Sequence, residues 1–153
     1  MALFLADEQD VEVDADDLLA LARHVMAARR VPSDMELSLL LVDADTIATM
    51  NAEHLGKPGP TDVLAFPIDE PGESPPDSPA ILGDVVLCPA VAHAQAAGLG
   101  RRPDDELRLL TVHGILHLLG FDHADPDQER AMFGLTDELL ASYAAASTSG
   151  ASP

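Results

Sequence analysis

The segment PDDELRLLTVHGILHLLGFDH, residues 103–123, combines a helix start, a long leucine-rich run and a helix stop. Proline and acidic side chains both suit the first turn of a helix, so Pro103 or Asp104 opens it. Gly120 ends it, because glycine readily adopts the left-handed conformation that follows many helices. The sequence therefore predicts a helix from Pro103 to Leu119, with leucines around its histidines.

Three of the six histidines lie in this segment. His113 and His117 are four residues apart, so they project from one face of the helix. The turn after Gly120 can bring His123 toward them. Three neutral imidazoles with an open fourth position are a common ligand set of catalytic zinc. We therefore predict one zinc ion per chain, bound by His113, His117 and His123. The other histidines stand alone and are expected to be structural or solvated: His24, His54 and His93.

The histidine spacing equals that of the metzincin protease signature HExxHxxGxxH, including its glycine. The second position is Gly114, where those proteases carry the glutamate that acts as general base. The spacing thus favours a metal site, and the missing glutamate argues against peptide hydrolysis.

Shorter periodic segments flank the histidine helix. The whole order is βαβαββααα, which predicts an α+β fold: a single domain, 1–145, with a small mixed β-sheet covered by helices and the metal site on a late helix and the turn after it. A disordered tail is expected over residues 146–153, and a proline-rich loop over residues 67–79. Strands are expected at residues 2–5, 35–42, 61–66 and 81–87. Helices are expected at residues 14–30, from Asp43 or Asp45 to about His54, from Pro89 to before Gly98, and from Pro126 to about Tyr143.

The chain of 153 residues carries 27 acidic residues against 8 lysines and arginines, a formal net charge of −19. That charge argues against a broad basic face for nucleic acid and against binding to an anionic membrane. No apolar run is long enough to span a membrane and no secretory signal is visible, so a cytoplasmic location is expected. Cys88 is the single cysteine, which excludes an internal disulfide and predicts a small core residue.

Beyond these patterns, HGILHLLGFDH resembles the signature of the YbeY-type endoribonucleases. PTDVLAFP, residues 60–67, is similar to the family's PTDVLSFP, and LGDVVL, residues 82–87, is similar to its LGDI strand. The resemblance extends over residues 35–140. It implies an α+β fold, zinc at His113, His117 and His123, and cleavage of single-stranded RNA. It also implies a role in maturation of the 3′ end of small-subunit ribosomal RNA and in ribosome quality control. Ribosomal RNA and the small ribosomal subunit are the implied partners, and neither DNA nor a membrane is expected.

Three further residues are candidates for catalysis. Asp122 and Asp84 carry carboxylates that can accept a proton, although Asp122 can equally orient a ligand histidine and Asp84 can equally be structural. Lys57, the only lysine, can contact phosphate as a point charge. Members of the family usually carry an arginine where Leu55 stands, and a serine where Ala65 stands. These departures leave two alternatives: a non-catalytic ribosome-maturation factor with structural zinc, or a zinc hydrolase of another substrate.

RNA binding by so acidic a chain requires a local group of cations. Five arginines are candidates for such a group, and if they hold the RNA, binding weakens steeply with added salt. They are Arg23, Arg29, Arg30, Arg101 and Arg102.

Overall fold

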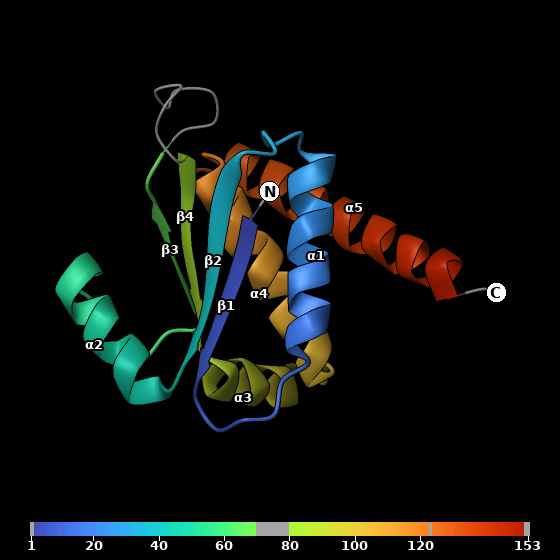
Figure 1. Ribbon diagram of the computed structural model, residues 1–153. Helices are drawn as coiled ribbons and strands as arrows, with labels where there is room; N and C mark the ends of the chain where they lie inside the picture. The colour runs from blue at the N-terminus through green and yellow to red at the C-terminus, as the bar shows by residue number, and fades with distance from the viewer. Residues whose placement is uncertain (1, 70–79, 123, 152–153) are drawn as a thin grey trace.

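A computed structural model describes residues 2–69, 80–122 and 124–151, the last five of these by backbone only. The elements follow the expected order βαβαββααα (Figure 1). The strands are β1 (Ala2–Glu8), β2 (Met35–Val42), β3 (Val63–Pro67) and β4 (Ala80–Leu87). The helices are α1 (Ala15–Ala28), α2 (Ala44–Leu55), α3 (Pro89–Leu99), α4 (Pro103–Leu118) and α5 (Pro126–Ala151).

The four strands form one sheet in the order β1-β2-β4-β3. β1, β2 and β4 are parallel, and β3 runs antiparallel to β4. The mixed sheet and the α+β class predicted from the sequence are therefore confirmed. β2 and β4 lie in the middle, which explains why MELSLLLV and AILGDVVL are the most apolar strands.

The two faces of the sheet are covered unequally. α1 and α4 pack on one face, where the main core includes Leu21, Leu39 and Ile115 (Figure 1). On the other face α2 covers a smaller cluster that contains Ile47 and Cys88. Cys88 is fully buried and has a free thiol, as expected from the sequence.

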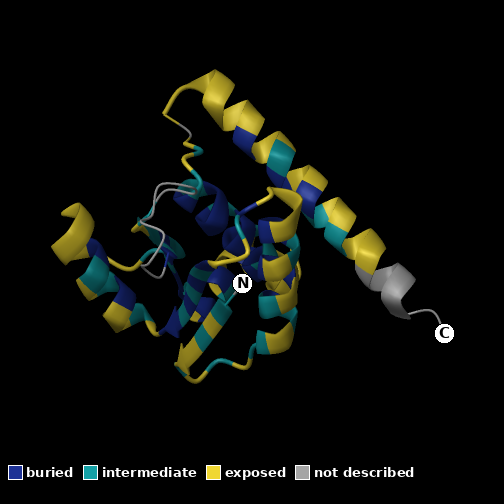
Figure 2. Cartoon of the chain, turned by 45° about the horizontal axis from the view of Figure 1, so that its top comes forward, coloured by how far each residue is buried: buried dark blue, intermediate teal, exposed yellow. Residues whose placement is uncertain are grey.

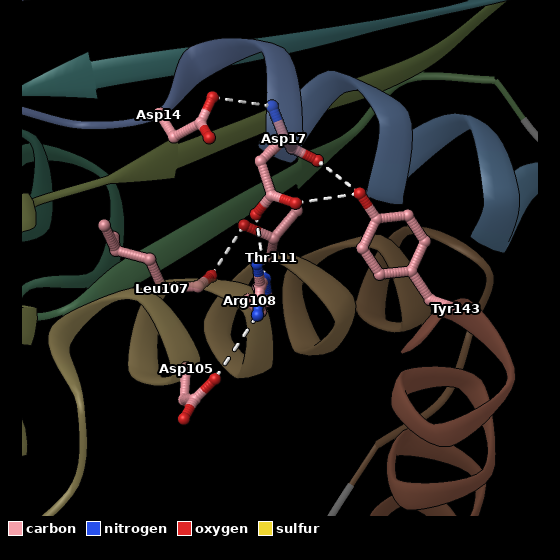
Figure 3. A network of polar contacts seen from close by, with 7 residues as sticks. All are labelled: Asp14, Asp17, Asp105, Leu107, Arg108, Thr111 and Tyr143. Carbon is pink, nitrogen blue, oxygen red and sulfur yellow. Dashed lines mark hydrogen bonds and ion pairs between the residues drawn. The ribbon is translucent and has the colours of Figure 1, made fainter. Parts of the chain in front are cut away.

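α5 crosses α4 and reaches α1, and most of its outer surface is exposed (Figure 2). Asp17 joins these three helices (Figure 3). Its Oδ2 accepts a hydrogen bond from Nε of Arg108 on α4, and its Oδ1 accepts one from the hydroxyl of Tyr143 on α5, both at 2.8 Å. The carboxylate of Asp17 on α1 thereby connects α5 to α1 and α4.

Several element ends differ from the sequence expectation. α3 passes Gly98 and ends at Gly100, because Gly100 is the glycine with the left-handed backbone (φ 68°). α5 continues beyond Tyr143 to Ala151, since alanine is the strongest helix former. The tail expected over residues 146–153 thus overlaps the last turns of α5, and residues 152–153 lie outside the described part. Most of the loop expected over residues 67–79 also lies outside it.

No described helix is both long enough and apolar enough to cross a membrane.

Candidate functional site

The histidine helix lies directly against the sheet at Gly114. A Cβ atom on Gly114 would lie 2.5 Å from Cγ1 of Val85 on β4, closer than any real contact between carbon atoms. The signature therefore needs a glycine at this position for packing, and a glutamate would not fit. With Gly114 against the sheet, His113 and His117 stand on the flank of α4.

Both histidines line a cavity of about 830 Å³. Its walls come from α4, β3, the end of α2, the segment after α4 and the start of α5. The described residues that line it include both polar and apolar groups: the two histidines, three carboxylates, one lysine and several apolar side chains. The residues used below are Leu55, Lys57, Asp62, His113, His117, Phe121, Asp122, Glu129 and Phe133.

Four of the residues proposed from the sequence line this one cavity. Asp122 and Lys57 line it together with the pair His113 and His117. His123 lies outside the described residues. Gly120 has a φ of 95°, as predicted for the turn that follows the helix.

Asp84 is not among the described residues that line the cavity. It lies on β4 between Ser38 of β2 and Phe66 of β3. Its neighbour Val85 packs on Gly114, and because side chains alternate along a strand, Asp84 faces the other side of the sheet.

The ring of His113 is held by Phe133 from α5. The two ring centroids are 5.1 Å apart and the rings are inclined by 62°, an edge-to-face arrangement. Phe133 and Glu129 are four residues apart on α5, so they lie on one face of that helix. Glu129 therefore also reaches the cavity.

Lys57 is positioned by Asn51, which is buried near the end of α2. The side-chain amide of Asn51 donates to the carbonyl of Gly59 at 3.0 Å, and the backbone carbonyl of Asn51 accepts from the backbone amide of Lys57 at 3.3 Å. Asp62 shapes the opposite end of this loop. Its Oδ1 accepts hydrogen bonds from the amide of Val63 and the hydroxyl of Thr61.

The five candidate arginines do not line this cavity within the described part of the chain. Arg29 contacts a residue of the cavity wall, with its guanidinium carbon 5.5 Å from the ring centroid of Phe121. Arg101 and Arg102 line a second cavity, of about 790 Å³, between the start of α4 and α5.

The isolated histidines have the contacts of structural residues where these are resolved. His24 lies 2.7 Å from the hydroxyl of Ser142 and edge-on to Tyr143. His54 lies edge-on to Phe66. His93 is partly buried on α3.

Sequence reasoning missed Glu129 and Phe133. The signal for them is the apolar periodicity of α5, which places both on the side that faces α4. Periodicity alone does not say which part of α4 that side meets.

The donor set suits a metal ion in its chemistry. His113 and His117 supply two imidazoles from one helix face, and zinc commonly takes three such ligands. The described residues contain no group of three or more histidine, cysteine or acidic side chains placed to bind a metal. The zinc site at His113, His117 and His123 therefore stays a prediction.

This protein is a small α+β domain in which two histidines of one helix and several carboxylates line one cavity. These features are typical of hydrolytic enzymes, and we place the protein in that class. The family model described as Endoribonuclease YbeY matches residues 4–144, and the chain belongs to this family.

Close relatives support the assignment. The chain is 52% identical over 151 residues to the Endoribonuclease YbeY of Salinispora tropica, covering 94% of this chain and 96% of the relative. It is 53% identical over 152 residues to that of Acidothermus cellulolyticus, covering 95% and 93%. The solution structure of the protein TM1509 from Thermotoga maritima has 26% identity, covers 99% of this chain and 94% of its own, and superposes with a TM-score of 0.64.

Proposed function

We propose that this protein is a single-strand-specific, metal-dependent endoribonuclease that acts in ribosomal RNA maturation. Membership of the endoribonuclease family, together with one cavity lined by His113, His117 and three carboxylates, is the observation that supports this function. The small ribosomal subunit is the proposed partner, the 3′ end of its RNA the proposed substrate, and the cytoplasm the proposed location.

His113, His117 and His123 would bind the zinc ion. A bound zinc ion would polarise a phosphoryl oxygen and lower the pKa of water. Cleavage also requires a group that accepts the proton of the attacking hydroxyl or water. Asp122 and Glu129 line the cavity and carry carboxylates that can accept this proton.

Lys57 provides the cation that faces the phosphate. Asn51 holds the backbone of its loop, so the ammonium group approaches the cavity from the side of α2. A lysine offers a point charge rather than the two parallel hydrogen bonds of an arginine.

The test compares wild type with His117→Ala and His54→Ala. Elemental analysis measures zinc in each protein, and gel analysis measures cleavage of single-stranded and double-stranded RNA with and without a chelator. We expect His117→Ala to lose both zinc and cleavage, while the matched control His54→Ala keeps both. Cleavage that survives chelation and also survives His117→Ala would refute the proposal.

A second candidate function is that of a non-catalytic maturation factor with structural zinc. Leu55 favours it, because Leu55 lines the cavity, is 53% exposed and stands where relatives usually carry arginine. Leu55→Arg separates the two functions. A nuclease gains cleavage rate from the added guanidinium, whereas a binding factor stays inactive and its His113→Ala variant still relieves precursor accumulation in cells.

A further inference from the structure

Aromatic residues are scarce in this protein, and they are concentrated at the cavity. The chain has four phenylalanines and one tyrosine, and two of the phenylalanines, Phe121 and Phe133, line the cavity. Phe133 is 45% exposed, although an apolar ring of that size is ordinarily buried. Part of the Phe133 ring therefore stays accessible beside its edge-to-face contact with His113. The exposed ring therefore lies immediately beside the reacting centre.

The charges around the cavity are poorly suited to bind an RNA strand through its phosphates alone. Asp62, Asp122 and Glu129 contribute three carboxylates, and Lys57 is the one lysine or arginine among the described residues that line the cavity. Each phosphate would meet more negative than positive charge outside the immediate metal site. Affinity for the strand is then expected from the uncharged parts of the nucleotide, which are the sugar and the base. Of these two, the base is the part that an exposed aromatic ring can stack on.

We propose that a nucleobase of the RNA substrate stacks on Phe133, next to the cleaved phosphodiester, with Leu55 on the opposite element as an apolar wall. This inference rests on the proposed function and identifies how the same site selects its substrate. Stacking on an aromatic side chain suits every base and requires that the base be unpaired. A duplex presents no free base face, so this contact makes the site selective for single strands.

Two substitutions of Phe133 distinguish base stacking from a purely structural role of this residue. Phe133 also supports His113, so its removal can disturb the metal ligand. Phe133→Leu keeps an apolar side chain of similar bulk against His113 but has no aromatic face. Phe133→Tyr keeps the aromatic face. The pair therefore distinguishes stacking from simple support of the histidine.

The experiment uses short single-stranded RNAs that carry one 2-aminopurine, moved a nucleotide at a time across the cleaved bond. Fluorescence of this base falls when it stacks. Single-turnover cleavage at increasing enzyme concentration separates the half-saturating concentration from the maximal rate, and elemental analysis gives the zinc content.

We expect quenching at one position with wild type and Phe133→Tyr. With Phe133→Leu that quenching is lost and the half-saturating concentration rises about 5- to 150-fold, the range for loss of one stacked base, with zinc content unchanged. Three results would overturn the proposal: wild-type quenching and saturation in Phe133→Leu, a loss of maximal rate or zinc with saturation unchanged, or equal defects in Phe133→Leu and Phe133→Tyr. If wild type cleaves no RNA, the proposed function fails first and this inference with it.

Discussion

Gly114 explains why the histidine helix has no glutamate between its first two histidines. The helix approaches β4 so closely that a Cβ atom would overlap a methyl group of Val85. A protein with the same histidine spacing and a glutamate at this position must separate the helix from the sheet. In this protein Gly114 occupies that position and packs against the sheet. The carboxylates of the cavity come from other segments, such as those of Asp122 and Glu129.

Gly114→Ala is therefore expected to destabilise the fold. The added methyl group meets a β-branched side chain that has little freedom to move, and overpacking of this kind costs about 1–3 kcal/mol. Urea unfolding followed by circular dichroism measures the loss.

Two further variants control this experiment. Val85→Ala removes the methyl groups that clash, so the double variant should lose less stability than the sum of the two single variants. Gly98→Ala also adds a methyl group inside a helix, but nothing lies within 4 Å of it, so it should be neutral or stabilising. Equal losses for Gly114→Ala and Gly98→Ala would contradict the packing explanation.

At the level of helices and strands, α2 depends on the capping residue that precedes it. Asp43 accepts a hydrogen bond from the amide of Thr46 at 2.8 Å and so caps the helix that carries Leu55 to the cavity. Hydrogen bonds from Thr46 lower the pKa of Asp43 below its ordinary value. A lowered pKa means that the carboxylate stabilises the fold above the pKa of the unfolded chain, and that this contribution is lost as the pH falls through the folded value.

Asp43→Asn tests this pH dependence. Asparagine is also a good cap but does not titrate, so the stability of the variant should lack the Asp43 contribution to acid loss. Wild type and variant are compared by urea unfolding at neutral pH and again below about pH 4, the ordinary aspartate range. The variant should gain on wild type as the pH falls, and Asp43→Ala should be less stable than both at neutral pH. A constant difference between wild type and Asp43→Asn would contradict the role of the charge.

Asp17 controls how the three helices meet. Arg108 and Tyr143 both donate to its carboxylate, and the hydrogen bond to Asp17 raises the pKa of Arg108 (Figure 3). Asp17→Ala removes the carboxylate that both side chains donate to, while Arg108 keeps Asp105 and the Tyr143 hydroxyl keeps the backbone carbonyl at position 17. The loss should cost about 1–3 kcal/mol of unfolding free energy. Tyr143→Phe removes one hydrogen bond and should cost about 1 kcal/mol.

The double variant, Asp17→Ala with Tyr143→Phe, should cost less than the sum of the two, because both changes break one contact. Asp16→Ala, a change at an exposed neighbour in the same helix turn, is the control and should cost about 0.5 kcal/mol. Additive losses from Asp17 and Tyr143 would show that the carboxylate does not connect α1 to α5.

The elements also show how far the sequence predicts this structure. Within the described part of the chain, hydrophobic periodicity predicts the nine elements in the right order, because each element packs apolar side chains against one of the two clusters on either side of the sheet. It also placed His113 and His117 on one helix face, since that relation is local. The predicted ends of α3 and α5 were wrong, because a glycine such as Gly98 also occurs inside helices, and because the small polar residues 147–150 mask the helix preference of the alanines before them. Phe133 and Glu129 could not be assigned to the cavity, since the crossing of α5 over α4 depends on contacts such as Asp17 with Tyr143 that are distant in sequence.

At the level of the whole molecule, the cations are spread rather than gathered at the cavity. The sequence suggested a patch of five arginines, but Arg101 and Arg102 line the second cavity, and Arg101 lies 3.6 Å from Glu106. Arg29 lies 5.5 Å from the ring centroid of Phe121, which lines the cavity. A strand bound at the histidines therefore meets Lys57 and Arg29, while the net charge of −19 repels it at longer range.

This arrangement predicts a weak salt dependence of RNA binding, in place of the steep one that an arginine patch would give. Each phosphate neutralised on a single strand contributes about −0.7 to the slope of log K against log salt, so two cations give about −1.4 and five arginines about −3.5. Added salt also screens the long-range repulsion, which flattens the slope further.

Fluorescence anisotropy of a labelled single-stranded RNA across a salt series measures this slope. Lys57→Ala should reduce the slope by about 0.7 and Arg102→Ala should leave it unchanged. A steep slope that becomes shallower in Arg102→Ala would instead place the strand along the second cavity. The arginines, and not the stacked base, would then supply most of the binding affinity.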